Sequence, residues 1–549
     1  MQKPSLGLGA LVGALTSLPL LALFYLGEKA VGLPFAPFIL FDWMARVLPG
    51  DVVTFGIDTM VDVIRTLNLG PTSETAKGVE QFLALVMIIA GGALLGFVVA
   101  FVRRRALSGR GDAGRPEWSG PQLGAALGLV AFIVTVIAAM SLGLSGNPLL
   151  VTLWLILLWV GWGTAVGSLV DSSAANAGPA DAERRDALLK LVGGSLGLAL
   201  GAWGVGRLFA AEASSAAAQT GAGQPLPPAL PTTEAARTPA VAATATATQD
   251  LGNRIEPAPG TRPEVTSNEA FYRIDINTRP PVIDGDTWQL EVAGLFENTG
   301  PLTLDDLMAY PAVTQPITLS CISNRIGGDL IGTSYWTGVR LRDVVNDLQL
   351  KPEAGALFLE AEDGFYETVV MDDILDERTL LVYGMNDETL PIEHGFPLRI
   401  YIPNRYGMKQ PKWIVRMEAI EAWAPGYWVD RGWSREARPH IISVVDTIAT
   451  DAASDGRVPI GGIAWAGSRG IQKVEVKVDN GAWTEAQLRK PPLSTLAWVQ
   501  WRYDWPAQSG QHTFTVRATD GTGALQIAEE TSVRPDGATG YHSKTARFG

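Results

Sequence analysis

Ile317-Thr-Leu-Ser-Cys321-Ile-Ser-Asn324-Arg325-Ile-Gly327-Gly328 is the stretch that decides how the second half of this chain is interpreted. Four residues of β-type composition lead into a polar, glycine-rich loop in which backbone amides can approach a ligand closely. Cys321 is the single cysteine of 549 residues, which excludes an intrachain disulfide framework, an iron–sulfur cluster and a cysteine-based zinc site. We expect the adjacent Arg325 to favour the thiolate, the form that nucleophiles and metal ligands require. The alternative is that Cys321 serves only as a small, buried apolar side chain in the core.

Three groups of motifs surround this loop, and together they resemble the sulfite oxidase family over about residues 263–530. The metal-ligand segment of that family is matched by Cys321-x-x-Asn324-Arg325 and Gly332-Thr333-x-x-Trp336-Thr-Gly338-Val339-x-Leu341. The pterin-phosphate segment is matched by His394-Gly395-Phe396-Pro397-x-Arg399 and Pro403-x-x-Tyr406-Gly407-x-Lys409-x-x-Lys412-Trp413. The dimerisation domain is matched by Gly462-x-Ala464-Trp465-x-Gly467 and Val474-x-Val476-x-x-Asp479-x-Gly481-x-Trp483.

The resemblance implies an oxidoreductase that carries Mo-molybdopterin, with Cys321 as the protein's ligand to the metal. Soft sulfur suits a metal that changes oxidation state. Arg273 and Arg325 are expected to act in catalysis. The residues expected to bind the cofactor are Asn268, Phe271, Tyr272, Arg273, Cys321, Asp363, His394, Arg399, Gln410 and Lys412. Each of these residues could instead have a purely structural role. His394 and Asp363 could lie in turns, Arg399 could be a charge on a strand surface, and Asn268 could cap a helix. Trp336 and Trp413 are expected to be packing residues.

Two departures from the family bear on the substrate. Sulfite oxidases carry a second arginine after the cysteine loop's Arg, and it helps to bind the oxyanion, but here Ile326 follows Arg325. Their active-site Tyr lies in a segment that matches residues 427–433, where Asp430 or Arg431 stands in its place. The expected reaction is two-electron oxo transfer on a small substrate, either a sulfite-like oxyanion or a sulfoxide. No flavin motif, cytochrome b5 segment or cysteine cluster is present, so we expect a separate electron carrier, a cytochrome or a quinone.

The first 210 residues contain five apolar stretches that are long enough for transmembrane helices, since about 20 residues span the hydrocarbon core. They lie at about 7–26, 81–102, 122–144, 148–170 and 187–210. Residues 33–48 are also apolar but contain Asp42, Arg46 and two prolines, which indicates an interfacial or re-entrant piece. No histidine precedes residue 394, so this region lacks the ligands of a bis-His haem. We interpret it as a membrane anchor.

The distribution of basic residues predicts the orientation of these helices. With the N-terminus inside, the inner loops hold eight Lys and Arg residues and the outer loops hold four. Five spans then place the catalytic domain outside the cytoplasm, in a multi-pass protein of the cell membrane. Arg184-Arg185 before the last apolar stretch resembles a twin-arginine export signal, although paired arginines also serve as ordinary membrane anchors.

The remaining chain divides by composition. Residues 211–262 are rich in Ala, Thr and Pro and are expected to form a flexible linker. Residues 263–432 mix short strands and helices, as in an α+β molybdopterin-binding domain. Residues 433–535 show alternating strands separated by turns, such as Asp479-Asn480-Gly481, and predict an immunoglobulin-like β-sandwich of dimerisation type. The fold class is thus an all-α transmembrane bundle followed by these two domains, and the resemblance implies a homodimer.

Charge and composition leave few other classes of function. A net charge of −13 argues against nucleic acid as a partner, since phosphate binding needs clustered basic residues. A non-catalytic membrane protein that keeps the fold as a scaffold is the main alternative, although it would not need Cys321. A transporter with an external sensor domain would want ionisable residues within the spans, and Lys190, near the start of the last span, is the candidate for this role.

Overall fold

The computed structural model describes residues 3–107, 118–143, 147–175, 192–202, 204–205, 220–226 and 254–549, with side chains not placed at 173–175 and 452. These residues form two compact units. The helical unit contains residues 1–63, 75–218 and 276–279, and the C-terminal unit contains residues 64–74, 219–275 and 280–549. Each unit therefore includes a short segment that the sequence places in the other half of the chain.

The helical unit is built on four helices that are long and apolar enough to cross a membrane. They are α1 (Leu6–Val31), α4 (Thr72–Ala106), α5 (Gly120–Ser141) and α6 (Pro148–Ala175). Two shorter helices, α2 (Ala36–Val47) and α3 (Gly50–Thr66), lie between α1 and α4 in the chain. Of the predicted fifth span, the described residues show a shorter apolar helix, Val192–Ala202. Residues 204 and 205 are also helical, while the rest of that span and the Arg184-Arg185 pair lie outside the described residues.

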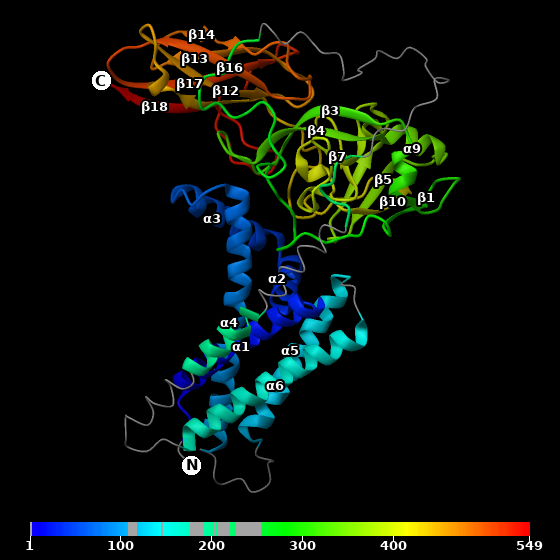
Figure 1. Cartoon of the computed structure of the whole chain (residues 1–549), viewed down its shortest axis with the longest axis vertical. Coiled ribbons are helices and arrows are strands. Elements are labelled where there is room, and N and C mark those ends of the chain that lie inside the picture. Colours follow the sequence, from blue (N-terminus) through cyan, green and yellow to red (C-terminus); the bar gives the residue numbers. More distant parts are fainter. Residues whose placement is uncertain are drawn as a thin grey trace. The chain divides into compact units, whose positions relative to one another are not determined.

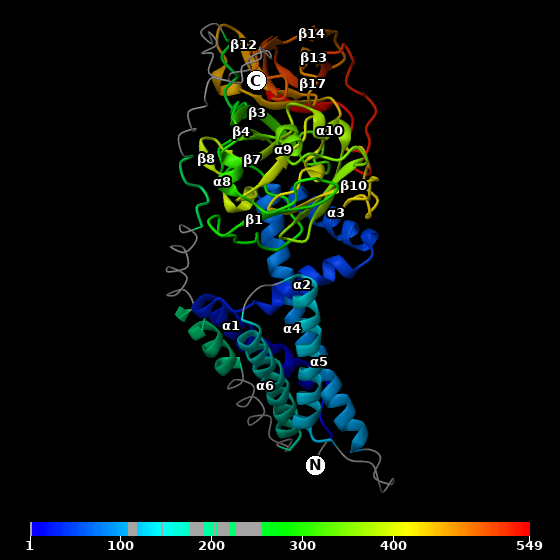
Figure 2. The same cartoon turned by 90° about the vertical axis from the view of Figure 1, so that its right-hand side faces the viewer.

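Glycine contacts bring the long helices together in pairs. A Cβ atom on Gly13 would overlap the carbonyl oxygen of Gly92, and one on Gly124 would overlap that of Gly163. Small residues allow such close backbone approach between helices in lipid. A Cβ atom on Gly92 would overlap Ser17 and Gly13, whereas one on Gly91 would meet nothing within 4 Å. Figures 1 and 2 show the second pair, α5 and α6, lying side by side along their length.

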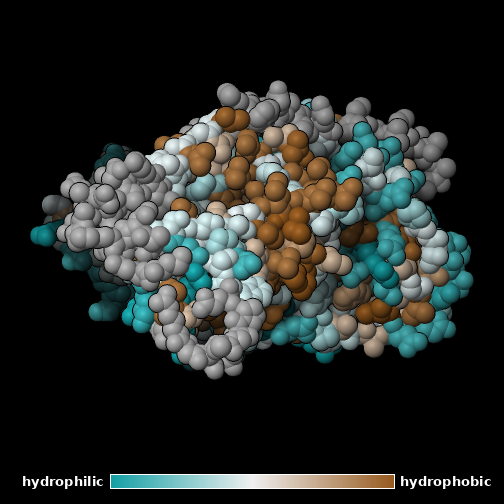
Figure 3. Space-filling view, turned by 90° about the horizontal axis from the view of Figure 1, so that it is seen from below, coloured by the Kyte–Doolittle hydropathy of each residue, from teal (hydrophilic) through white to brown (hydrophobic). Residues whose placement is uncertain are grey.

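The outer surface of these helices is strongly apolar. Leu94, Leu153 and Leu157 are each more than half exposed. A view from below shows apolar side chains gathered in a broad patch (Figure 3). A soluble protein rarely leaves so much contiguous apolar surface in water, and the helices therefore suit a lipid environment.

The segment Ile276–Arg279 belongs to the helical unit and is held there by polar side chains. Asp42 Oδ1 on α2 accepts the N–H of Thr278 at 3.0 Å, and Arg46 donates to the Asn277 side chain at 2.7 Å. Lys77 on α4 donates to the Asn277 carbonyl oxygen at 2.9 Å. Arg279 pairs with Glu28 on α1.

The first part of the C-terminal unit contains two sheets. One has the strand order β2-β1-β10-β5-β6, and the other has the order β3-β4-β7-β8 with β9 paired to β7. The strands are β1 (Gln289–Gly294), β2 (Leu302–Thr303), β3 (Val313–Ser320), β4 (Ile331–Arg340), β5 (Ala356–Ala361), β6 (Tyr366–Val370), β7 (Leu380–Met385), β8 (Glu388–Thr389), β9 (Arg399–Tyr401) and β10 (Ile414–Ile420). The short helices are α8 (Leu304–Met308), α9 (Leu341–Asp347) and α10 (Met371–Leu375), with 3-10 turns η2 (Ile392–His394) and η3 (Gly407–Lys409).

Apolar strands place the loops that carry the polar motifs. Every residue of β7 is buried, as expected for a central strand covered on both faces. A core that includes Leu290, Val339, Leu359 and Leu398 packs between the sheets and the short helices. The loop Cys321–Leu330 joins β3 to its antiparallel neighbour β4, and η2 and η3 flank β9. The polar motifs are therefore held at the ends of buried strands.

The last part of the C-terminal unit is sandwich-like, with sheet orders β11-β12-β16-β15 and β14-β13-β17-β18. Its strands are β11 (Ile442–Ile448), β12 (Arg457–Trp465), β13 (Ile471–Val478), β14 (Trp483–Glu485), β15 (Gln487–Leu488), β16 (Val499–Pro506), β17 (Gly510–Asp520) and β18 (His542–Phe548), and η4 covers Thr450–Ala452. Both sheets contribute side chains to one core, including Val445, Trp501 and Phe514. β18 lies beyond the predicted domain end at residue 535 and pairs with β17.

Two parts of the expected linker make specific contacts in the C-terminal unit. Thr389 of β8 donates its N–H to the Gln224 carbonyl oxygen at 2.7 Å, and Gly223 donates its N–H to the Leu390 carbonyl oxygen at 3.3 Å. Arg262 pairs with Asp446 of β11 at 2.7 Å. Residues 220–226 thus extend the edge of one sheet, and residues 254–262 lie against the sandwich.

Candidate active site

Cys321 lies directly after β3, where the chain leaves the sheet. Its N–H donates to the Leu330 carbonyl oxygen at 3.0 Å, and its Sγ lies 3.1 Å from Ser323 Oγ. The side chain is buried, and this burial raises the pKa of the thiol above its usual value, against the opposing effect of hydrogen bonds from Ser323. The sequence predicted that Arg325 would favour the thiolate, but in the structure burial has the largest effect, and it favours the neutral thiol. A bound metal ion would reverse the balance, because coordination removes the thiol proton.

Tyr272 and Tyr406 stand near Cys321. Burial raises the pKa of Tyr406 to about 12 and that of Tyr272 further, and Cys321 adds to both shifts. A Cβ on Gly407 would lie 3.1 Å from the Tyr272 hydroxyl and 3.5 Å from Ser320 O, next to Cys321. The phosphate-segment motif therefore reaches the cysteine through Tyr406 and Gly407. Tyr406 lies within the phosphate-segment motif, but nothing in the sequence pattern predicted a role for it.

Phe271 and His394 connect residues 268–273, which precede β1, to the same site. The Phe271 ring lies edge-on to Trp336 and His394, with centroids 5.4 and 5.5 Å away. Burial lowers the pKa of His394 to about 3, so its ring is neutral and donates from Nε2 to the Asn268 carbonyl oxygen at 2.9 Å. The Asn268 side chain donates to Glu388 at 3.0 Å. The neutral His394 ring is thus bonded to the Asn268 backbone, and the Asn268 side chain is held by the Glu388 carboxylate.

Arg399 is the most unusual cation of the site. Its guanidinium lies over the Trp336 ring, 4.8 Å from the centroid, and donates to His394 O at 3.0 Å. The side chain is fully buried, which lowers its pKa to about 10, and its Nε has no hydrogen-bond partner. A buried cation without a carboxylate is costly. Such a group fits an anionic ligand that would complete its hydrogen bonds.

Arg273 and Lys412 meet at Asp275, an aspartate that the sequence motifs do not include. Arg273 Nε lies 2.6 Å from Asp275 Oδ2, and Lys412 Nζ lies 3.4 Å from the same oxygen. Burial lowers the pKa of Lys412 to about 8, and the charge of Asp363 also acts on this lysine. Asp363 accepts the N–H of Phe365 in a turn at 3.0 Å. One carboxylate, Asp275, is therefore shared by two cations of the predicted site.

Gln410 supports the loop around it. Its side-chain nitrogen donates to the carbonyl oxygens of Ile402 and Arg405 at 3.3 and 3.0 Å, and its buried Oε1 has no partner. Beside it, Lys409 forms a buried ion pair with Glu367 of β6 at 2.8 Å. This pair was not predicted, because nothing in the sequence connects a strand glutamate with a lysine 42 residues later.

The residues that depart from the family pattern, Ile326 and Asp430 or Arg431, all make specific contacts in the structure. Ile326 packs against the apolar cluster that contains Ile322, Tyr406 and Trp433. Asp430 accepts the Tyr366 hydroxyl at 2.7 Å, and Arg431 stacks on the Tyr427 ring, 3.6 Å from its centroid. Trp336 and Trp413 are fully buried, so their expected role in packing is confirmed.

The residues present fit the expected cofactor. Arg399 Nε and Gln410 Oε1 are buried without partners, and Arg399, Arg273 and Lys412 outnumber the carboxylates near them. A dianionic phosphate with a polar ring system supplies the acceptors and donors that these groups lack. Arg399, Lys412 and Gln410 would hold that part of the molecule. Cys321 would supply the soft ligand to its metal.

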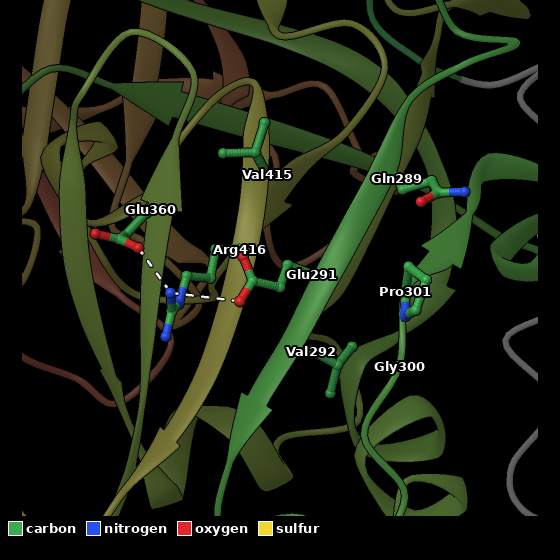
Figure 4. Close-up of a pocket in the computed structure, with 8 residues that line it drawn as sticks. All are labelled: Gln289, Glu291, Val292, Gly300, Pro301, Glu360, Val415 and Arg416. Atoms are coloured by element: carbon green, nitrogen blue, oxygen red, sulfur yellow. Dashed lines mark ion pairs between the residues drawn. The ribbon is translucent and has the colours of Figure 1, made fainter. Parts of the chain in front are cut away.

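A separate pocket lies on the first sheet (Figure 4), and no predicted site residue lines it. Its floor carries Arg416, which pairs with Glu291 and Glu360 at 3.4 and 3.5 Å. Arg416 Nε, like Arg399 Nε, has no hydrogen-bond partner, but the charge of Arg416 is paired with carboxylates, whereas no carboxylate pairs with Arg399 among the described residues.

Comparison with known proteins agrees with this arrangement. Residues 277–428 match the family described as oxidoreductase molybdopterin binding domain, and residues 438–537 match the Mo-co oxidoreductase dimerisation domain. The uncharacterized oxidoreductase YuiH of Bacillus subtilis (strain 168) is 34% identical over 152 residues, which cover 28% of this chain and 75% of that protein.

More distant relatives include the mitochondrial sulfite oxidase of Drosophila melanogaster. It is 25% identical over 296 residues, which cover 45% of this chain and 51% of that protein, so the chain spans about half of its length. Among solved structures, the sulfane dehydrogenase SoxCD from Paracoccus pantotrophus aligns with a TM-score of 0.46 and 20% identity, over 54% of this chain and 83% of that one.

The matched residues contain the cysteine loop and the phosphate segment that the structure brings together. The chain is an oxidoreductase of the sulfite oxidase family, and its cofactor is Mo-molybdopterin.

Proposed function

We propose that the protein is a membrane-anchored enzyme that transfers an oxygen atom between water and a small substrate, with Cys321 as the metal ligand. In the oxidative direction, water supplies the oxygen atom, and two electrons and two protons are released. The electrons pass to a separate carrier, a cytochrome or a quinone. The reductive direction consumes the same electrons and protons and returns water.

One observation carries this proposal. The buried Cys321 and a buried, incompletely bonded cation, Arg399, both lie close enough to Tyr272 to act on it electrostatically. A scaffold would gain nothing from an unpaired buried guanidinium, whose desolvation costs free energy. A cofactor site requires such a group, because the anion arrives with the cofactor.

The substrate class follows from the side chains that replace the family's oxyanion-binding residues. Ile326 adds apolar surface where the family has a second arginine, and Arg431 is engaged with Tyr427. Fewer positive charges near the metal weaken the binding of a dianion such as sulfite. A sulfoxide, which carries no net charge, suits this site better than a sulfite-like oxyanion.

The location is also part of the proposal. Four long apolar helices suit a bilayer, and the predicted orientation places the N-terminus inside and the catalytic domain outside, after five spans. A reporter enzyme fused after residue 262 should then be active only outside the cytoplasm. Cytoplasmic activity of that fusion would overturn the orientation and leave the chemistry untouched.

The match to a dimerisation domain supports a homodimer formed through the C-terminal sandwich. We further assign this sandwich to the immunoglobulin-like class, on the basis of its two four-stranded sheets around one core. Sedimentation of the purified protein in detergent should then give twice the mass of one chain.

Metal analysis combined with one substitution tests the central proposal. The purified protein should contain about one molybdenum per chain, as expected for a single cofactor site. Cys321→Ser should retain the pterin and lose nearly all turnover per bound metal, because a hard hydroxyl is a poor replacement for a thiolate. A scaffold would purify without molybdenum. A buried structural cysteine would let the Ser variant lose stability but keep its activity per metal.

A further inference from the structure

The cysteine loop, Cys321–Leu330, is closed by its own hydrogen bonds. Cys321 donates its N–H to Leu330 O, and Leu330 donates its N–H to Asn324 Oδ1 at 3.1 Å. Asn324 in turn donates its N–H to Cys321 O at 3.1 Å. A shift at residue 329 or 330 is therefore transmitted to the backbone of the cysteine itself.

A segment from the N-terminal half contacts this loop. Residues Ile64–Glu74, which join α3 to α4, belong to the C-terminal unit. Asp329 Oδ2 accepts the N–H of Thr72, the first residue of α4, at 2.7 Å. Ile64, Thr72 and Ser73 are almost completely buried. A carboxylate at a helix start satisfies a free N–H group and opposes the positive end of the helix dipole.

The other side of the loop is held by the last strand. A Cβ on Gly327 would overlap the His542 ring, so this glycine allows the ring to lie directly on the loop. His542 Nδ1 accepts the N–H of Val445 at 3.0 Å, which leaves the proton on Nε2 facing the loop. Arg65 acts on His542 electrostatically, so the segment and the strand meet near the same loop.

We propose that the segment Ile64–Glu74 is a positioning element of the metal-ligand loop, acting through the hydrogen bond from Thr72 to Asp329. This inference rests on the proposed function, in which Cys321 binds the metal. It gives the N-terminal half a part in shaping the catalytic centre, although that half lies outside both matched family regions. Asp329 and Thr72 are positioning residues, since they reach the metal only through Cys321.

Three variants of the full-length protein test the hydrogen bond from both ends. Asp329→Ala removes the acceptor, and Asp329→Asn keeps an acceptor oxygen without the charge. Thr72→Pro removes the donor at the first helical position, where proline is tolerated. Asp306→Ala is the matched control, because Asp306 caps α8 through Thr303 at 2.8 Å, away from the cysteine loop.

Hydrogen exchange of the amides of residues 321–330 is the primary measurement, and the paramagnetic signature of one-electron-reduced molybdenum is the second. Asp329→Ala and Thr72→Pro should each speed exchange in this loop about tenfold, as expected when a local opening becomes easier. Both should alter the metal signature, and the double variant should add little to either. Asp329→Asn should stay close to the wild type, and Asp306→Ala should change neither measurement.

Two failures are distinguishable. Unchanged exchange and an unchanged metal signature in Asp329→Ala, with molybdenum bound and Cys321→Ser inactive, would overturn the positioning role and leave the proposed function intact. A wild-type protein without molybdenum would overturn the proposed function, and with it the inference that rests on it.

Discussion

Lys409 and Glu367 form an ion pair that is closed off from solvent, with 2.8 Å between Nζ and Oε1. Glu367 also accepts the N–H of Thr368 at 2.8 Å, and its carboxylate lies so close to Gly426 that no Cβ fits there. Lys409 ends the loop that carries Tyr406 and Gly407, and Gly426 begins the segment that contains Asp430. The pair therefore fastens two loops beside the cysteine.

Removal of one partner from this pair should be strongly destabilising. Lys409→Met would leave a buried carboxylate without its cation, at a cost of roughly 3–5 kcal/mol. Glu367→Gln combined with Lys409→Met should recover most of that loss, because both charges are then gone. Thermal unfolding in detergent measures the effect, and Lys351→Met, at the solvent-exposed pair with Glu297, is the control. Equal melting temperatures for both single lysine variants would contradict a buried ionic role.

Loss of the Arg399 side chain should lower cofactor retention. Arg399→Ala removes charge-assisted hydrogen bonds, each worth roughly 1.5–3 kcal/mol, from the cofactor site. Molybdenum per purified chain should fall well below that of the wild type. Arg416→Ala removes the same side chain from the separate pocket in Figure 4 and should retain the metal. Full metal content in Arg399→Ala would show that the guanidinium does not hold the cofactor.

The stability of the C-terminal unit should fall in mild acid because of His542. Burial lowers the pKa of His542 to about 4, from 6.5 in an unfolded chain. Between these values the unfolded state binds a proton that the folded state does not, so stability decreases as the pH falls from 6.5 to 4. Thermal midpoints across this range should drop less in His542→Gln than in the wild type. Parallel pH profiles for the two proteins would show that His542 does not cause the loss of stability in acid.

The close pairing of α1 and α4 should depend on one of two adjacent glycines. A Cβ on Gly92 would overlap Ser17 Oγ, whereas one on Gly91 meets nothing within 4 Å. Gly92→Val should cost about 1–3 kcal/mol through overpacking, and Gly91→Val should be tolerated. Resistance to unfolding in detergent distinguishes the two. If both variants behave alike, the contact between these helices is not a tight one.

The sequence predicted the strand before Cys321, the helices of 20 residues or more and the polar motifs, because each follows from a local pattern. His394 and Arg399 are in contact in the structure, as residues five apart in one motif can be. The hydrogen bond from Thr72 to Asp329 joins residues that are 257 positions apart, so no local sequence pattern could have predicted it. Asp275 was overlooked for a similar reason, since its role depends on Lys412, 137 residues later.

The C-terminal boundary of the sandwich could not be predicted from the sequence for a different reason. β18 alternates polar and apolar residues only weakly, and most of its side chains are partly or fully exposed. Pairing with β17 defines this strand more than burial does. His542 lies at its start, so the contact with Gly327 could not be found without the strand.

The glycine contacts between the long helices also have a genetic consequence. Gly9 and Gly13 face Gly92 and Gly96, and the pairs recur four residues apart, with Gly124 against Gly163 and Gly120 against Gly167 on the other two helices. Every missense change at a glycine codon adds at least a Cβ, so no conservative replacement exists at these positions. In a library of random mutants selected for function, tolerance should fall at every fourth residue along these faces and recover at neighbours such as Gly91. The apolar anchor would then carry a periodic pattern of intolerance, distinct from the isolated intolerant positions of the catalytic loops.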